Sequence, residues 1–188
     1  GAGALTWYNS NSHPMTGPGG TIYHKVHDFS YALARPFAHN AYWGVTAHYR
    51  NREIKGIEEP QGLWAGDVGI LFKLSGPWQM GGAALNAFGR EKSVAAAGFA
   101  FTPNPRLTLG FDGYDILNSK DNRSLRFGGE YLFDGGIALR GGLQRGIDND
   151  WEAWSWGAGL NVDNWRMEYA FLGGDYNGVH TLGVTWHF

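Results

Sequence analysis

Histidine and acidic side chains are the residues of this chain with the clearest capacity for chemistry. The sequence contains seven His, 17 Asp and Glu and no Cys, which excludes disulfides, thiolate nucleophiles and thiolate metal sites. His24 and His27 are three residues apart, so a strand would place them on opposite faces, away from a shared metal ion. The segment Asp148-Asn149-Asp150 has oxygen ligands of the kind that bind Ca²⁺, but a solvated turn is the stronger interpretation. We therefore expect neither a metal nor a cofactor.

The elements that position these residues are predicted to be strands, because apolar side chains alternate with small or polar ones. In 154–162, for example, Trp154, Trp156 and Leu160 alternate with Ser155. A period of two residues is the pattern of a β-strand with one apolar face. The alternation is also present at 24–35, 43–50, 64–74, 107–112, 125–133, 137–143, 165–171 and 182–188, more weakly at 78–89 and 94–102, and least clearly at 4–8.

The composition fits a membrane barrel better than a soluble β-sandwich or a lipocalin-like barrel. Charged residues make up only 17% of the chain, against about 25% in ordinary soluble domains. The polar faces of the predicted strands are rich in Gly, Ala and Ser, which is too sparse for a solvated exterior but suits a crowded aqueous lumen. A net charge of −2 gives no electrostatic footprint for nucleic acid, so that partner is excluded.

The connections between the predicted strands alternate between tight turns and longer polar segments. Outer-membrane barrels show this pattern, with short periplasmic turns and longer external loops. About twelve strands of 9–11 residues fit the chain, and ten to fourteen are tolerable. We therefore predict an all-β, antiparallel, up-and-down transmembrane β-barrel over 1–188, a single domain in the bacterial outer membrane with both termini periplasmic.

The predicted faces define two groups of functional residues. The side chains expected to line the lumen are His48, Arg50, Asp67, Lys73, Asp112, Arg126, Glu130, Arg140, Gln144, Arg166 and Glu168. The aromatic side chains expected at the membrane interfaces are Trp43, Tyr49, Trp64, Trp154, Trp165, Phe171 and Trp186. Because buried charges are normally paired, we expect ion pairs of Glu130 with Arg140 and of Arg166 with Glu168. Charged rings that select ions are the alternative.

The last nine residues carry a recognisable pattern. Leu182, Val184 and Trp186 alternate with smaller or polar residues, and the final residue is the aromatic Phe188. This segment resembles the terminal strand of bacterial outer-membrane barrels. The resemblance implies that the barrel-assembly machinery recognises these four residues during biogenesis. It also implies a mature protein surrounded by lipid and lipopolysaccharide.

A narrower resemblance covers residues 40–188. It is carried by the segments 105–112, 125–133, 138–142, 168–171 and 180–182. This series is similar to the C-terminal half of PorV/PorQ-type barrels in the FadL-like superfamily, although the chain lacks their Asn-Pro-Ala plug segment. The resemblance implies a non-enzymatic accessory or scaffold subunit of an outer-membrane assembly, with another outer-membrane or surface protein as partner. Small residues at 81–84 and 95–98 would let such a partner approach closely.

Two other classes of function stay open. A passive channel for small solutes through the polar lumen is the alternative, since twelve strands enclose more space than the eight that side chains just fill. An outer-membrane enzyme that modifies lipid comes third, because His48-Tyr49-Arg50-Asn51 resembles the His-x-Ser-Asn segment of lipid A deacylases. Arg50 stands where that family has its serine, so the pair of nucleophile and base needed for acyl transfer is missing. We therefore expect no enzymatic activity.

Overall fold

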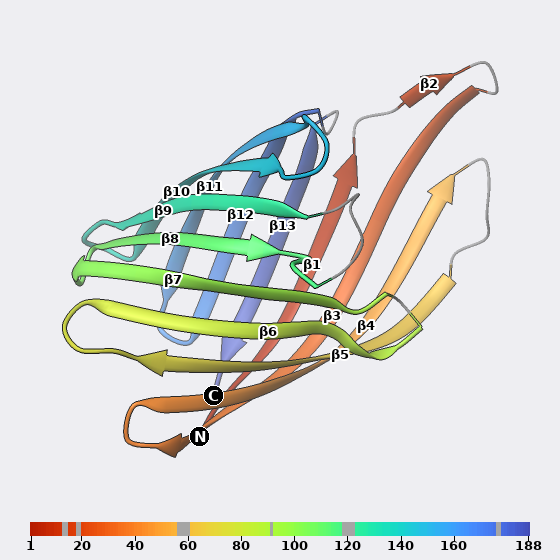
Figure 1. The fold of residues 1–188 in the computed structure, drawn as a ribbon. Helices are drawn as coiled ribbons and strands as arrows, with labels where there is room; N and C mark the ends of the chain where they lie inside the picture. The colour runs from red at the N-terminus through yellow and green to blue at the C-terminus, as the bar shows by residue number, and fades with distance from the viewer. Residues whose placement is uncertain (13–14, 18–19, 56–60, 91, 118–122, 176–177) are drawn as a thin grey trace.

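The computed structural model describes residues 1–12, 15–17, 20–55, 61–90, 92–117, 123–175 and 178–188. Among them no helix is long and apolar enough to cross a membrane. The regular elements described are thirteen β-strands (Figure 1): β1 (Ala2–Ser12), β2 (Met15–Gly17), β3 (Gly20–Ala38), β4 (Ala41–Lys55), β5 (Gln61–Lys73), β6 (Trp78–Gly89), β7 (Val94–Asn104), β8 (Leu107–Tyr114), β9 (Ser124–Leu132), β10 (Ile137–Gly146), β11 (Glu152–Val162), β12 (Trp165–Gly174) and β13 (Val179–His187).

The strands close into a barrel in chain order. β1 pairs with β13 on one side and with β3 on the other. From β3 to β13 each strand is antiparallel to the next, while the three-residue β2 pairs with the outer end of β3. Leaving out β2, the ring has twelve strands, which confirms the predicted up-and-down antiparallel barrel (Figure 1).

The C-terminal aromatic residue closes the ring against β1. The backbone amides of Gly3 and Phe188 each donate to the other residue's carbonyl oxygen at 3.0 Å. The Phe188 ring stacks on Tyr31, with 6.0 Å between ring centroids, and lies 5.2 Å from the Trp186 ring. A Cβ atom on Gly3 would collide with the outer edge of the Phe188 ring, so a larger residue there would have to displace the ring. Recognition of the terminal strand by the assembly machinery remains a prediction.

Short turns and both termini lie at one end of the barrel, called here the short-turn end. The His187 amide donates to the Asn164 carbonyl in the turn between β11 and β12 at 2.9 Å, which places the C-terminus there. At the opposite end β3 and β4 reach beyond their neighbours (Figure 1). They have 19 and 15 residues, against roughly 9–11 needed to cross a bilayer. One side of the wall therefore projects past the other.

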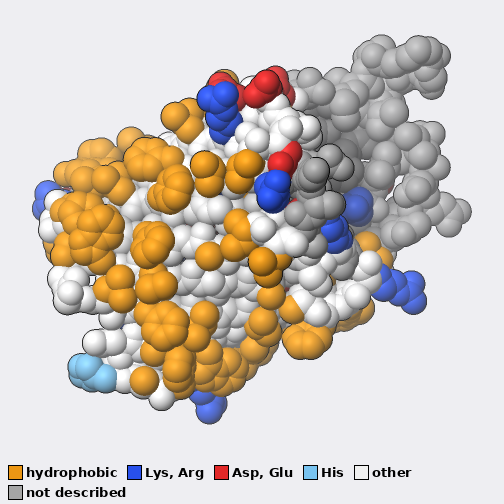
Figure 2. All heavy atoms as spheres, viewed as in Figure 1, with side chains coloured by type: hydrophobic (Ala, Val, Ile, Leu, Met, Phe, Trp, Pro, Cys, Tyr) orange, Lys and Arg blue, Asp and Glu red, His pale blue; other side chains and the backbone are white. Residues whose placement is uncertain are grey.

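An ion pair identifies the inner face of the wall. Arg166 Nη2 on β12 lies 3.5 Å from Glu130 Oε2 on β9, although β10 and β11 stand between these strands. Three strand spacings amount to roughly 14 Å along a sheet, so the two side chains can meet only on the concave side. Residues in register with Glu130 and Arg166 therefore face the lumen. Their neighbours face outward, where Figure 2 shows apolar side chains spread over the wall and charges near its edges.

The structure places the predicted interface aromatics on this outer face in two bands. Trp43, Trp165 and Trp186 lie toward the short-turn end, and Tyr49, Trp64, Trp154 and Phe171 toward the opposite end. Rings on adjacent strands contact each other within each band. Their centroid separations are 5.1 Å for Tyr49–Trp64, 5.3 Å for Trp154–Phe171 and 6.3 Å for Trp165–Trp186. The two bands match the aromatic girdles of a membrane barrel.

Candidate functional site

The structure places the predicted lumen residues on the inner face in three groups, with Lys73 apart from them. His48, Arg50 and Asp67 lie on β4 and β5. Asp112, Arg126 and Gln144 lie on β8 to β10, and Glu130, Arg140, Arg166 and Glu168 lie on β9 to β12. Lys73 is the last residue of β5 at the short-turn end. Strands far apart in sequence thus supply polar groups to one enclosed space.

Asp28 on β3 is the centre of the first group, and its side chain is completely buried. Its Oδ1 accepts from His48 Nδ1 at 3.1 Å, and its Oδ2 accepts from Arg50 Nε at 3.0 Å and from the Tyr8 hydroxyl at 3.1 Å. His48 Nε2 donates to Asp67 Oδ2 at 2.8 Å. Because both ring nitrogens face carboxylate oxygens, the imidazolium form, which donates from both nitrogens, is the one that satisfies both contacts. These five residues, the Asp28 network, contain two carboxylates and two cations.

Asp67 joins this network to an irregularity in β6. Its other oxygen, Oδ1, accepts from the backbone amide of Asn86 at 2.8 Å. Asn86 has a φ of 51°, a left-handed conformation that Asn tolerates better than most residues. The ladder between β5 and β6 shifts register between Gly66 and Val68. Bulges of this kind re-aim side chains next to functional sites. Here the bulge leaves Asp67 without a cross-strand partner on β6.

Two members of the network, Asp28 and Tyr8, are absent from the residues predicted from the sequence. Asp28 carries a signal, since it precedes the outward Phe29 and the alternation therefore puts it inside. The sequence does not predict an inward position for Tyr8, because aromatic residues are the type expected on the outer face. Only the pairing of β1 with β3, which sets Tyr8 opposite Asp28, reveals its inward role.

The group on β9 to β12 consists of four charged side chains that pair with one another, and it is called here the Arg140 cluster. Arg140 Nε donates to Glu130 Oε2 at 2.5 Å, and its Nη1 donates to Glu168 Oε1 at 2.6 Å. Arg166 Nε donates to the same Glu168 oxygen at 2.9 Å. Both expected ion pairs are therefore present, and the charges cancel. The Arg140 guanidinium lies over Gly159, where an added Cβ would be 3.3 Å from Nη2.

The group on β8 to β10 surrounds Arg126. Its guanidinium lies 3.6 Å from the ring centroid of Tyr114, close enough for a cation–π contact, and Asp112 is its cross-strand partner. The Gln144 side chain, with its oxygen toward the guanidinium, accepts from Arg126 Nε at 3.2 Å and from the Ser124 hydroxyl at 3.1 Å. Arg126 is thus held in place by aromatic, amide and carboxylate neighbours.

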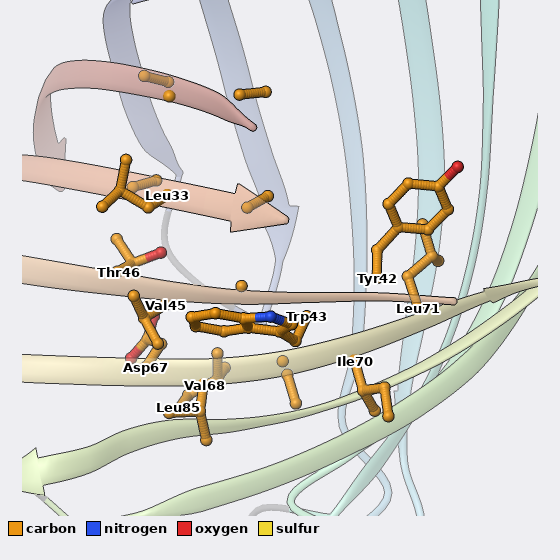
Figure 3. A pocket seen from close by; sticks show the side chains of 18 of the residues that line it. Leu33, Tyr42, Trp43, Val45, Thr46, Asp67, Val68, Ile70, Leu71 and Leu85 are labelled. Atoms are coloured by element: carbon orange, nitrogen blue, oxygen red, sulfur yellow. The ribbon is translucent and has the colours of Figure 1, made fainter. Parts of the chain in front are cut away.

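The lumen contains space that these side chains leave open. One cavity of about 400 Å³ is lined by Asp112, Arg126 and Gln144, among others. A second, of about 380 Å³, is lined by Tyr8, Glu168 and Thr181 among others. Arg140 and Ser155 line both cavities, which therefore adjoin at these two residues. A third cavity of about 490 Å³ lies against β3 to β6 (Figure 3). Twelve strands thus enclose more volume than their inward side chains occupy.

Within the described ranges, no group of three or more His, Asp or Glu side chains is arranged to hold a metal ion. The carboxylate of Asp148, weighed above as a Ca²⁺ ligand, binds Arg123 just before β9, with 2.8 Å between Nε and Oδ2. This hydrogen bond raises the pKa of the Arg123 guanidinium above its usual value, so the pair stays charged. His48 engages both ring nitrogens with carboxylates, which leaves neither of them free to act as a base toward a hydroxyl group.

Comparison with known proteins gives matches in structure. No protein family and no curated protein matches the sequence. The KdgM porin superposes with a TM-score of 0.67 at 10% identity, covering 98% of this chain and 99% of that chain. The same scores hold for the KdgM porin in complex with disordered oligogalacturonate. A mutant porin of Rh. blastica gives a TM-score of 0.55 at 12% identity, covering 100% of this chain and 99% of that chain.

These matches correct the expected function. The sequence predicted an accessory or scaffold subunit of the PorV type, but the solved structures compared above are porins. The scaffold interpretation is therefore wrong, and the channel alternative fits better. At 10–12% identity the similarity establishes the fold alone. The chain folds as a closed antiparallel β-barrel similar to those of porins, which are integral proteins of the bacterial outer membrane.

Proposed function

We propose that this protein is a passive, non-enzymatic channel for small solutes across the outer membrane, with both termini on the periplasmic side. The observation that carries the proposal is the open space on either side of Arg140, about 400 and 380 Å³, within a closed ring of strands. The fold of the KdgM porin, one structure of which holds oligogalacturonate, supports a channel. A scaffold would not need a hollow lumen lined by polar groups.

The lumen charges favour weak ion selectivity. The Asp28 network contains two carboxylates with an imidazolium and a guanidinium, and the Arg140 cluster contains two of each sign. Arg126 faces Asp112 across the ladder. A permeating solute therefore meets groups of opposite charge that are paired with each other. Strong selection for cations or for anions comes instead from a ring of charges of one sign.

Planar-bilayer recording tests the proposal. The purified barrel should give discrete conductance steps in KCl, with reversal potentials in a salt gradient that show similar permeability for K⁺ and Cl⁻. A bilayer that stays silent under conditions where the KdgM porin conducts would overturn the proposed function. Swelling of proteoliposomes in isosmotic solutions of neutral solutes would then measure the size limit of the lumen.

Replacing Arg140 with alanine is expected to raise single-channel conductance and to shift selectivity toward cations. The change removes the larger of the two side chains that line both cavities and leaves Glu130 and Glu168 with less positive charge nearby. Arg106→Ala is the matched control, since Arg106 binds the exposed Asp134 in a turn outside the lumen. Unchanged conductance in Arg140→Ala would show that solutes do not pass this point.

A further inference from the structure

Of the three lumen cavities described above, the one against β1 and β3 to β6 has the fewest charged side chains in its lining. It is about 490 Å³ in volume and lies toward the short-turn end, against β1 and β3 to β6 (Figure 3). The residues that line it from the inner face are mostly small or apolar and include Ala4, Ala32, Ala34, Gly44, Gly69 and Leu71. This space is named the apolar chamber. The inner wall of β3 to β6 is thus apolar over its short-turn half, beyond the Asp28 network, whereas the wall across the ring carries the charged Arg140 cluster.

The two ends of the chamber carry different polar groups. Asp67 and Thr46 line its inner end, and both Asp67 oxygens already accept hydrogen bonds from His48 and Asn86. Tyr42 and His187 line it near the short-turn end. There the Lys73 ammonium lies 5.1 Å from the centroid of the Tyr42 ring.

Lys73 does not itself line the chamber, but its ammonium group lies over the ring of Tyr42, which does, and so brings a positive charge to this end. In the part of the chain that the structure describes, no carboxylate lies within ion-pair distance of its ammonium group, whose recorded contact is the Tyr42 ring. A cation beside an apolar cavity matches a ligand with one anionic head and an apolar body. The charged residue that lines the inner end is the acidic Asp67, so a carboxylate head is better placed at the end beside Lys73.

We propose that the apolar chamber binds small amphipathic monocarboxylates, with a short alkyl or aryl body in the chamber and the carboxylate beside Lys73. The inference rests on the proposed channel function and names a class of solute for it. A sugar or another polyol fits this chamber less well, because the apolar lining would leave its hydroxyl groups without partners. An apolar body instead leaves water for a surface of matching chemistry.

Block of the channel current by carboxylates of increasing length tests the inference. Butanoate, hexanoate and octanoate are added at equal concentrations to the barrel in a KCl-bathed planar bilayer, with protein-free bilayers as the control for partition into lipid. The apparent affinity should rise about two- to fourfold for each methylene group. Lys73→Met should weaken block by hexanoate while leaving block by hexanol unchanged.

Two glycines on the inner face provide a matched pair of variants. A Cβ on Gly69 would meet atoms no closer than 3.6 Å, and one on Gly110 would meet nothing within 4 Å, so both positions accept a Cβ atom from which a side chain can extend into the lumen. Gly69 lines the apolar chamber, whereas Gly110 lines the cavity beside Arg126. Gly69→Leu should abolish the dependence on chain length, and Gly110→Leu should preserve it.

The outcomes separate the inference from the channel function. Normal conductance with no dependence of block on chain length would overturn the carboxylate site and leave the channel standing. Absence of conductance would overturn the channel. In that case, titration calorimetry of the same acids into barrels held in lipid nanodiscs tests whether the apolar chamber binds carboxylates. Heats of binding that grow with chain length would support the site, and the absence of such heats would refute it.

Discussion

Asp28→Ala is expected to lower the free energy of unfolding of the barrel by about 3–5 kcal/mol, the usual cost of removing one partner from a buried charge network. The side chain is completely buried and accepts hydrogen bonds from His48, Arg50 and Tyr8. Alanine would leave the imidazolium and the guanidinium without their shared carboxylate in a confined space. Denaturant titration of the barrel in lipid vesicles, followed by tryptophan fluorescence, measures the loss.

Two variants calibrate this result. Asp134→Ala removes a carboxylate of an exposed ion pair with Arg106 and should change stability by less than about 1 kcal/mol. Asp28→Asn keeps the shape and the accepting oxygen but removes the charge, so its loss should fall between the other two. If Asp28→Ala and Asp134→Ala proved equally mild, the network would contribute nothing to the stability of the barrel.

Much of the fold follows from alternation in the sequence. Trp154, Trp156 and Leu160 share one face of β11 because the side-chain period of a strand is two. The same period puts Glu130 and Arg140 on one face, and adjacency of their strands then brings them into contact. Strand order, faces and nearest-neighbour pairs are local properties of an up-and-down barrel, which is why they are predictable.

Features that depend on distant strands were not predictable. The contact of Arg166 with Glu130 bridges two intervening strands and requires the curvature of the closed wall. The left-handed backbone of Asn86 breaks the alternation in β6. A single Asn within a run of small and apolar residues does not predict such a break. The placement of the apolar chamber opposite the Arg140 cluster likewise depends on which strands face each other across the ring.

The small residues at 81–84 and 95–98 show how one pattern allowed two functions. The expectation of a scaffold treated them as a surface for a partner. In the structure Ala83 pairs with Ala96 on the inner face, and Gly82 pairs with Ala97 on the outer face. Small side chains thus occur on both sides of the wall at β6 and β7. On the inner side they widen the lumen, an effect that serves a channel and needs no partner.

Trp156→Arg is expected to destabilise the barrel in lipid by about 2–4 kcal/mol, the cost of a basic side chain near the bilayer midplane on the outer face of a barrel. Trp156 lies near the middle of β11, and 49% of its surface is exposed. Its ring centroid lies 5.4 Å from that of Tyr169 on the neighbouring strand. Arginine would lose this contact and would place a charge against the lipid chains. The vesicle titration described for Asp28 measures the effect.

Two further variants separate the charge from the lost ring. Trp156→Leu removes the aromatic contact but keeps an apolar side chain, so the difference between leucine and arginine isolates the cost of the charge. Thr181→Arg places the same charge on the inner face, in the cross-strand row of Ala170 and Gly157. There it borders the cavity that Glu168 also lines, so it should be tolerated. Equal losses at Trp156 and Thr181 would contradict the assignment of inner and outer faces, on which the proposed channel depends.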